Sequence, residues 1–251
     1  RAKLVLLHRR ECPTPSHWET WKVRHPEHHD IARTIEKLRK IMEYGGEILL
    51  LRGDITDRQF VRDAIRAAKD KFGEINGVIH AAGILRDGPI HTKNSSEFEQ
   101  VIRTKAEGAV ALDLETRQEP LDFFLLFSSV ASVFGNAGQV DYAAANAFLD
   151  SYAYQRRLET GLPTMVVNWG TWNIGMASTE SVKRRSEEQG VLPMNTEVAL
   201  SALEASLVLS EVQVMLARLS SDKKRSLLAM DKTEVLMTQN RVAVKSVDSA
   251  M

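Results

Sequence analysis

Short apolar runs alternate with longer amphipathic stretches along most of this chain, and that alternation restricts the fold more than any other feature. The runs are Lys3 to Leu7, Glu47 to Leu51, Gly77 to His80, Leu121 to Phe127, Thr164 to Trp169 and Gln213 to Ala217. Most are continuously apolar, as is typical of strands that are buried on both faces of a parallel sheet. We therefore expect an α/β fold with a Rossmann-like, doubly wound parallel sheet.

The stretches between these runs carry apolar residues at helical spacing. The stretch over residues 57–71 has one apolar face, formed by Phe60, Val61, Ala64, Ile65 and Ala68. Ser96 with Glu99 forms a capping-box pattern before another stretch. These patterns predict helices over residues 57–71, 101–114, 143–159 and 197–209.

Two polar stretches interrupt the alternation. Residues 11–44 read as an insertion that ends in a helix over 31–42, and residues 220–251 read as a C-terminal tail or linker. We thus expect one catalytic domain over residues 1–219. His25, His28 and His29 lie in the insertion, and we interpret them as part of a solvated loop rather than a zinc site, since Cys12 is the only cysteine.

A dinucleotide-binding fold needs a strand, a Gly-rich turn and a helix, because the turn lets the backbone approach the pyrophosphate. The only close glycine pair, Gly45-Gly46, precedes a strand instead of following one. We expect the missing strand and turn to lie upstream of Arg1 and the strand to occupy the centre of the sheet. The alternative is a fold that does without them.

Composition excludes several classes of partner. The 33 basic residues balance 33 acidic ones, which gives no electrostatic reason to expect nucleic acid or an anionic membrane. No apolar run approaches the roughly 20 residues of a membrane helix. A single cysteine rules out an intrachain disulfide and favours a reducing, cytoplasmic compartment.

Four polar residues form a pattern that suits carbonyl reduction. Tyr142 and Asn146 are four apart on an expected helix and share a face. Ser129 follows a buried strand, where open α/β sheets bind ligands, and Lys105 lies on the preceding helix. A phenol can supply a proton, and a nearby ammonium lowers its pKa from about 10. Taken singly, each residue also fits an ordinary cap, surface or helix role.

The motifs around these residues resemble the ketoreductase domain of modular polyketide synthases, a branch of the short-chain dehydrogenase/reductase superfamily. The resemblance covers roughly residues 1–219 and rests on Phe127-Ser128-Ser129-Val130-Ala131, Gly138-Gln139, Tyr142-Ala143-Ala144-Ala145-Asn146-Ala147-Phe148-Leu149-Asp150, Val78-Ile79-His80-Ala81-Ala82-Gly83, Asn168-Trp169-Gly170 and Gly175-Met176-Ala177. In ordinary members a lysine lies four residues after the tyrosine. Here Asn146 holds that position and Lys105 holds the usual asparagine position, an exchange typical of polyketide and animal fatty-acid synthase ketoreductases.

The resemblance implies catalytic roles for these four residues. Tyr142 would donate the proton, Ser129 would bind the carbonyl oxygen, Lys105 would lower the pKa of Tyr142, and Asn146 would support Lys105. The implied partners are an acyl carrier protein, with a β-ketoacyl chain on its phosphopantetheine arm, and neighbouring synthase domains.

The cofactor implied by the resemblance is NADPH. The expected second strand of the fold ends in His8-Arg9-Arg10, and arginine suits a 2′-phosphate. Arg9 matches the family's phosphate contact, Asp54 and Ile55 match its adenine contact, and Ala81, Ala82 and Gly83 would back the ribose and nicotinamide. Arg9 and Arg10 also fit the role of ordinary loop charges.

The resemblance also suggests a stereochemical class. Leu85-Arg86-Asp87 fits the Leu-x-Asp triplet of one facial class, and Phe134 stands where the other class has a tryptophan. Asp87, Phe134, Gln139 and Met176 would then control substrate entry and give a D-configured (usually R) β-hydroxyl group. Two other functions remain open: a non-catalytic domain that shapes the synthase, and a free-standing reductase of small ketones.

Overall fold

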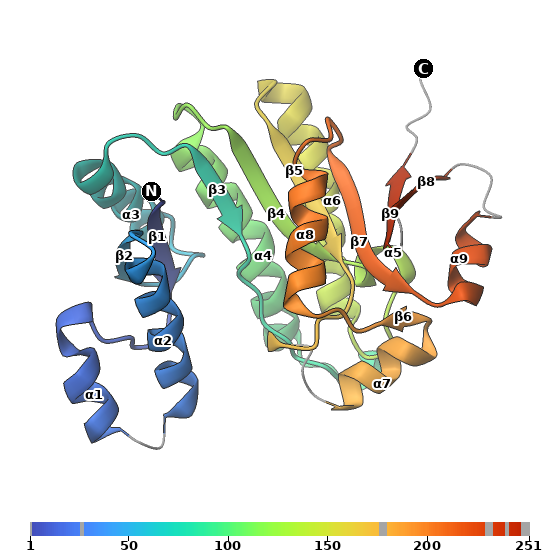
Figure 1. Cartoon of the computed structure of the whole chain (residues 1–251). Coiled ribbons are helices and arrows are strands. Elements are labelled where there is room, and N and C mark those ends of the chain that lie inside the picture. Colours follow the sequence, from blue (N-terminus) through green and yellow to red (C-terminus); the bar gives the residue numbers. More distant parts are fainter. Residues whose placement is uncertain (1, 26–27, 176–179, 229–232, 239–240, 247–251) are drawn as a thin grey trace. The chain divides into compact units, whose positions relative to one another are not determined.

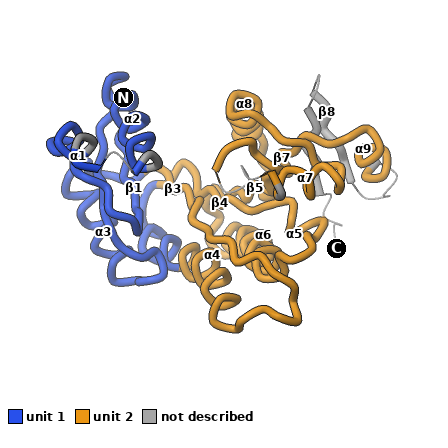
Figure 2. The backbone as a smooth tube through the Cα atoms, turned by 90° about the horizontal axis from the view of Figure 1, so that it is seen from below, with its two compact units in different colours: residues 1–75, 111–120 blue, residues 76–110, 121–251 orange. Residues whose placement is uncertain are grey.

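The computed structural model describes residues 2–25, 28–175, 180–228, 233–238 and 241–246 (Figure 1). Backbone contacts divide the chain into two compact units, shown in different colours in Figure 2. Unit 1 comprises residues 1–75 and 111–120, and unit 2 comprises residues 76–110 and 121–251. The catalytic domain expected over residues 1–219 therefore contains all of unit 1 and most of unit 2.

The elements follow the α/β order expected from the sequence. The strands are β1 (Lys3–His8), β2 (Glu47–Arg52), β3 (Gly77–His80), β4 (Phe123–Ser129), β5 (Thr164–Trp169), β6 (Val191–Leu192), β7 (Gln213–Leu219), β8 (Thr233–Thr238) and β9 (Arg241–Ser246). The helices are η1 (Pro15–His17), α1 (Trp18–Arg24), α2 (His29–Glu43), α3 (Arg58–Phe72), η2 (Ile90–Thr92), α4 (Ser95–Thr116), α5 (Ala131–Phe134), α6 (Val140–Thr160), α7 (Glu180–Glu188), α8 (Thr196–Ser206) and α9 (Ser221–Leu228), where η marks a 3₁₀ helix.

All six strands predicted from the apolar runs are present, as β1 to β5 and β7, and the five predicted helices are α2, α3, α4, α6 and α8. In the described part of the chain, no helix is long and apolar enough to cross a membrane.

Unit 1 contains a parallel pair of strands, β1 and β2, in register from Lys3 opposite Glu47 to His8 opposite Arg52. The insertion packs on this pair instead of extending into solvent. Trp18 from α1 and Ile35 and Leu38 from α2 form a buried cluster with Ile48 of β2. The polar pattern predicted the second of these helices but gave no sign of α1, which Trp18 anchors.

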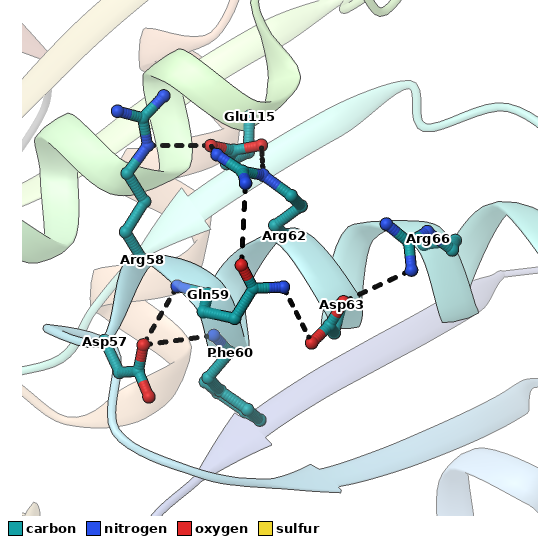
Figure 3. A network of polar contacts seen from close by, with 8 residues as sticks. All are labelled: Asp57, Arg58, Gln59, Phe60, Arg62, Asp63, Arg66 and Glu115. Carbon is teal, nitrogen blue, oxygen red and sulfur yellow. Dashed lines mark hydrogen bonds and ion pairs between the residues drawn. The ribbon is translucent and has the colours of Figure 1, made fainter.

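A polar network joins α3 to the C-terminal end of α4 within unit 1 (Figure 3). Asp57 caps α3 by accepting hydrogen bonds from two backbone N–H groups of its first turn, at 2.9 and 3.3 Å. Arg58 and Arg62 both donate to the Glu115 carboxylate, at 2.8 and 3.1 Å. These bonds hold the pKa of Glu115 below its usual range, with Arg62 the larger cause.

Unit 2 contains a sheet of order β3-β4-β5-β7-β9-β8, with β6 paired to β7 outside that path. The first four strands run parallel, as expected, and β9 and β8 add antiparallel strands beyond β7. Residues 220–251, interpreted as a tail or linker, thus include a helix and two strands. The two described sheets are separate, and the further central strand expected from the sequence stays a prediction.

The core of unit 2 lies on both faces of β5, every residue of which is buried. Met165 and Val167 point to one face, where they pack with Ala199 of α8. Helix α6 covers the opposite face and contacts β4 and β5, and α8 lies in front of the sheet in Figure 1. This arrangement holds the carboxyl ends of β3, β4 and β5 at one edge, where parallel sheets of this kind bind ligands.

Candidate active site

A cavity of about 320 Å³ opens at the carboxyl ends of these strands in unit 2. Its wall includes Ala81 after β3, Ser129 at the end of β4, Lys105 of α4 and Tyr142 of α6, and α7 supplies a further wall. The volume is within the range of small-molecule sites. The structure therefore brings three of the four proposed catalytic side chains to one cavity.

Tyr142 lies in the first turn of α6, close to the end of β4. Burial raises the pKa of its phenol, hydrogen bonds with the Ser129 and Asn146 side chains lower it, and the negative charge of Asp87 raises it, with a net upward result. The phenol is therefore protonated near neutral pH. Ser129 Oγ also accepts a hydrogen bond from the Ala131 N–H at 3.2 Å, which fixes the serine beside the tyrosine.

Lys105 is buried, with 3% of its surface exposed, and its ammonium faces the tyrosine. The Nζ atom lies 5.7 Å from the centre of the Tyr142 ring and donates to the Phe127 carbonyl at 2.8 Å. Burial lowers the pKa of Lys105 to about 8, and the negative charge of Asp150 opposes that shift. The site thus holds an ammonium that is charged at neutral pH and becomes neutral in mildly alkaline solution.

Two expectations about this group concern roles, and both stay predictions. Lys105 is expected to lower the pKa of Tyr142; the net shift of that pKa is upward, because burial of the phenol outweighs the hydrogen bonds that lower it. Asn146 was expected to support Lys105. Its amide nitrogen donates to the Tyr142 carbonyl one helical turn earlier, at 2.7 Å, and its buried Oδ1 atom has no hydrogen-bond partner among the described residues.

Asp150 is a functional candidate that the sequence reasoning did not select. It follows Tyr142 and Asn146 at four-residue intervals on α6, a spacing that could have revealed it. Its carboxylate accepts hydrogen bonds from Ser132 Oγ at 2.6 Å and Asn168 Nδ2 at 2.9 Å, and burial raises its pKa. These donors and the charge of Lys105 stabilise a carboxylate inside the unit.

His80 is a second group that the sequence reasoning missed. It is 1% exposed, and its Nε2 atom lies 3.0 Å from the Lys105 carbonyl oxygen. Because a carbonyl only accepts, Nε2 carries the hydrogen. Burial, helped by the charge of Lys105, lowers the pKa of His80 to about 3. The neutral ring therefore joins β3 to the turn of α4 that carries the lysine.

The residues proposed for substrate control lie in different surroundings. Asp87 accepts from Gln139 Nε2 at 3.0 Å through each of its two oxygens and pairs with Arg185 at 3.0 Å. Phe134 does not line the cavity; it packs with Val191 and Met215 in a separate apolar cluster. Met176 lies outside the described residues.

The proposed cofactor contacts fall in both units. In unit 1, Arg9 Nη1 lies 3.8 Å from Asp54 Oδ2, with about half of each side chain exposed, and Ile55 follows in the same loop. In unit 2, Ala81 lines the cavity, and Ala82 and Gly83 continue the chain after it.

The histidines of the insertion are partly described. Trp21 and His25 have ring centres 4.8 Å apart, and the ring of His28 lies 5.9 Å from that of Trp21. Among the described side chains, no group of three His, Cys, Asp or Glu residues is placed to hold a metal ion. The solvated-loop interpretation, which includes His29, stays a prediction.

Comparison with known proteins adds an independent observation. The family model of the KR domain matches residues 1–174. The chain belongs to the KR domain family, the ketoreductases of polyketide synthases. Polyketide synthase PksN of Bacillus subtilis is 36% identical over 199 residues, which are 76% of this chain but 4% of that synthase. Polyketide synthase GfsE of Streptomyces halstedii is 38% identical over 203 residues, 79% of this chain and 5% of that synthase.

Solved structures of KR domains have the same fold. The crystal structure of a ketoreductase domain from the bacillaene assembly line is 33% identical, with a TM-score of 0.76 over 91% of this chain and 52% of that one. An N-terminal ketoreductase from the macrolactin assembly line is 31% identical, with a TM-score of 0.73 over 90% of this chain and 41% of that one.

KR domains are oxidoreductases that bind a nicotinamide cofactor, and the residues of this KR domain fit such a group. The wall beside β3 is built from Ala81, whose small side chain leaves room for a flat ring. The Lys105 ammonium has three hydrogens and gives one to Phe127, which leaves donors for ribose hydroxyls. Trp169 lines the same cavity with a buried Nε1 hydrogen that has no partner in the described structure.

Proposed function

We propose that this KR domain reduces a β-ketoacyl thioester to a β-hydroxyacyl thioester with NADPH. The observation that carries the proposal is the convergence of the Tyr142 phenol, the Ser129 hydroxyl and the Lys105 ammonium on one cavity. In the overall reaction the carbonyl carbon gains a hydride, its oxygen gains a proton, and NADPH becomes NADP⁺.

The protein's part is to polarise the carbonyl and deliver the proton. Ser129 Oγ donates a hydrogen bond to the carbonyl oxygen and holds it beside Tyr142. The reduced nicotinamide supplies the hydride when bound. Tyr142 transfers its phenolic proton to the oxygen as negative charge develops there, and the buried ammonium of Lys105 stabilises the phenolate that results. Because its pKa is above the ordinary value of 10, the phenol carries its proton at neutral pH.

The choice of NADPH over NADH depends on Arg9. Its side chain is about half exposed, and its guanidinium can form a bidentate hydrogen bond with a 2′-phosphate. Asp54 and Ile55 are proposed to contact the adenine, and Ala81, Ala82 and Gly83 the ribose and nicotinamide.

The proposed substrate is carried on the phosphopantetheine arm of an acyl carrier protein, next to other synthase domains. Support comes from the relatives, which are polyketide synthases of which this chain spans only about 4 to 5%. The substrate would enter on the Asp87 side, beside Gln139, and give the D-configured alcohol.

The test follows nicotinamide absorbance in the protein that carries this chain, with a β-ketoacyl thioester and either NADPH or NADH. We expect turnover with NADPH and weaker turnover with NADH. In Arg9→Gln the ratio of the NADPH rate to the NADH rate should be smaller than in the wild type. Arg10→Gln, a substitution of the neighbouring arginine, is the control and keeps the preference. Chiral analysis of the product is expected to show the D-alcohol, and an L-configured product would contradict the Asp87 assignment. Absence of turnover with either cofactor would favour a non-catalytic domain.

A further inference from the structure

We propose that Arg185 is a positioning residue for the reduction: its ion pair with Asp87 holds helix α7 as a wall of the substrate cavity. The inference rests on the proposed function for its effect on the product. In this proposal Asp87 influences which face of the substrate carbonyl is reduced because it positions α7, and not because it contacts the substrate directly.

Helix α7 presents one face to the cavity. Val182, Ser186 and Gln189 line it and recur at four- and three-residue intervals, so they share a side of the helix and its C-terminal end. Arg185 lies on the same side, three residues after Val182. Its Nη2 atom lies 3.0 Å from Asp87 Oδ2, and about a third of each side chain is exposed.

Contacts other than the Arg185 ion pair also orient the Asp87 carboxylate. Asn136 Nδ2 donates to Gln139 Oε1 at 2.7 Å, which directs the amide nitrogen of Gln139 toward Asp87. The Gly88 N–H also donates to the Gly138 carbonyl at 2.8 Å. The loop with Asp87 and the segment before α6 therefore form one framework.

A buried ion pair fixes this framework to the catalytic helix. Lys93 Nζ lies 2.7 Å from Asp141 Oδ2, with 4% and 1% of the two side chains exposed, and Lys93 also donates to the Arg86 carbonyl. Asp141 directly precedes Tyr142. Since the loop is held from this side, loss of the Arg185 contact moves α7 and leaves Asp87 in place.

The other contacts of α7 do not replace this ion pair. Ser186 Oγ donates to the Val191 carbonyl at 2.8 Å, and Gln189 Nε2 donates to Asn136 Oδ1 at 3.3 Å. Ser186 Oγ also contacts Thr171 Oγ1, and none of these contacts involves a charged side chain. Arg185 is thus the described charged contact between α7 and the Asp87 side of the cavity.

The experiment compares Arg185→Gln, Asp87→Asn and the double variant in the protein that carries this chain. The substrate is a β-ketoacyl thioester of N-acetylcysteamine, which lacks the phosphate of the carrier arm. We expect each single change to lower the enantiomer ratio and raise KM by about two- to fivefold, the range of a partly exposed ion pair, while kcat changes less. The double variant should match the single ones, because both remove the same interaction.

Two variants distinguish loss of the Arg185–Asp87 ion pair from general destabilisation of the protein. Arg185→Lys keeps a cation and should restore most of the enantiomer ratio. Arg184→Gln removes the neighbouring arginine, which pairs only loosely with Glu188 at 3.9 Å on the solvent side, and should leave both quantities as in the wild type. An Arg185→Gln protein with wild-type ratio and KM on this substrate would overturn the proposal, and an effect restricted to carrier-bound substrate would assign Arg185 to anion binding instead.

Amide hydrogen exchange over residues 182–189 tests the same contact without turnover. Faster exchange in both Arg185→Gln and Asp87→Asn is expected, and unchanged exchange would overturn the proposal. If the wild type failed to reduce any substrate, only the proposed function would fail, because the exchange result would still decide whether Asp87 holds α7.

Discussion

The ammonium of Lys105 lies 5.7 Å from the centre of the Tyr142 ring, although the two residues come from different helices and are 37 positions apart. The lysine is buried, and its hydrogen bond to the Phe127 carbonyl aims it at the tyrosine. Burial of an ammonium is costly. We propose that the charge is retained because it stabilises a phenolate that develops at Tyr142.

Lys105→Met should therefore lower kcat by about 100-fold or more while the fold persists, since a neutral side chain cannot stabilise the phenolate. Turnover and nicotinamide binding by fluorescence would be measured together. Arg103→Met, on the exposed side of the same helix, is the matched control. Equal turnover in the two variants would show that the buried charge has no part in the reaction.

The charge of Lys105 also predicts an alkaline limit to activity. With a pKa of about 8, the ammonium loses its proton as pH rises through that value, and the rate should fall with it. Asp150 opposes the downward shift, so Asp150→Asn should lower the lysine pKa further and move the alkaline limb to lower pH. A pH profile of kcat at saturating cofactor checks this, and an alkaline limb that stays in place would exclude Asp150 as the counter-ion.

His80 predicts a loss of stability in mild acid. Its folded-state pKa of about 3 is below the ordinary value of 6.5, so the unfolded chain binds the extra proton between these values. Stability should fall as pH drops below about 6.5, by about 2 kcal/mol at pH 5 from this group. Urea unfolding at pH 7.5 and 5 would measure it. His80→Gln should lose less stability between the two conditions than the wild type, and an equal loss would contradict the assignment.

The buried pair between Lys93 and Asp141 predicts strong coupling in stability. Lys93→Met leaves a carboxylate buried without its partner and should cost about 3–5 kcal/mol of unfolding free energy. The double change with Asp141→Leu should recover much of that cost. Arg103→Met removes one member of an exposed pair and should change little. Chemical denaturation of all variants measures these values, and additive losses in the double variant would show that the two charges do not interact.

Much of the fold was predictable because hydrophobic pattern and burial agree. The continuous apolar run at Thr164–Trp169 became β5, all of whose residues are buried. Helix α1 was not predicted, because its stability depends on packing against distant elements and not on a local pattern. Strands β8 and β9 were not predicted, because residues 220–251 are polar and show no clear period in the sequence; the two strands pair with each other, and β9 also pairs with β7. Trp18 is an example: its indole N–H donates to the Pro13 carbonyl while its ring joins a cluster from α2 and β2.

The part of the candidate site that lies within recognisable motifs was predictable from the sequence. The ion pairs between residues that are far apart in the sequence were not. Tyr142, Ser129 and Lys105 come together as their spacing and resemblance indicated. No local pattern indicates that Arg185 contacts Asp87, since the two residues are 98 positions apart. The direction of the Tyr142 pKa shift also depends on burial, which a motif does not report.

Tyr142 is the residue that we propose as the proton donor. Its most direct test is the rate of NADPH oxidation with a β-ketoacyl thioester in the wild type and in Tyr142→Phe, which removes one hydroxyl group and keeps the ring. We predict turnover in the wild type and a loss of about 100- to 10,000-fold in the variant, with the unfolding free energy nearly unchanged. Equal rates in the two proteins would contradict it.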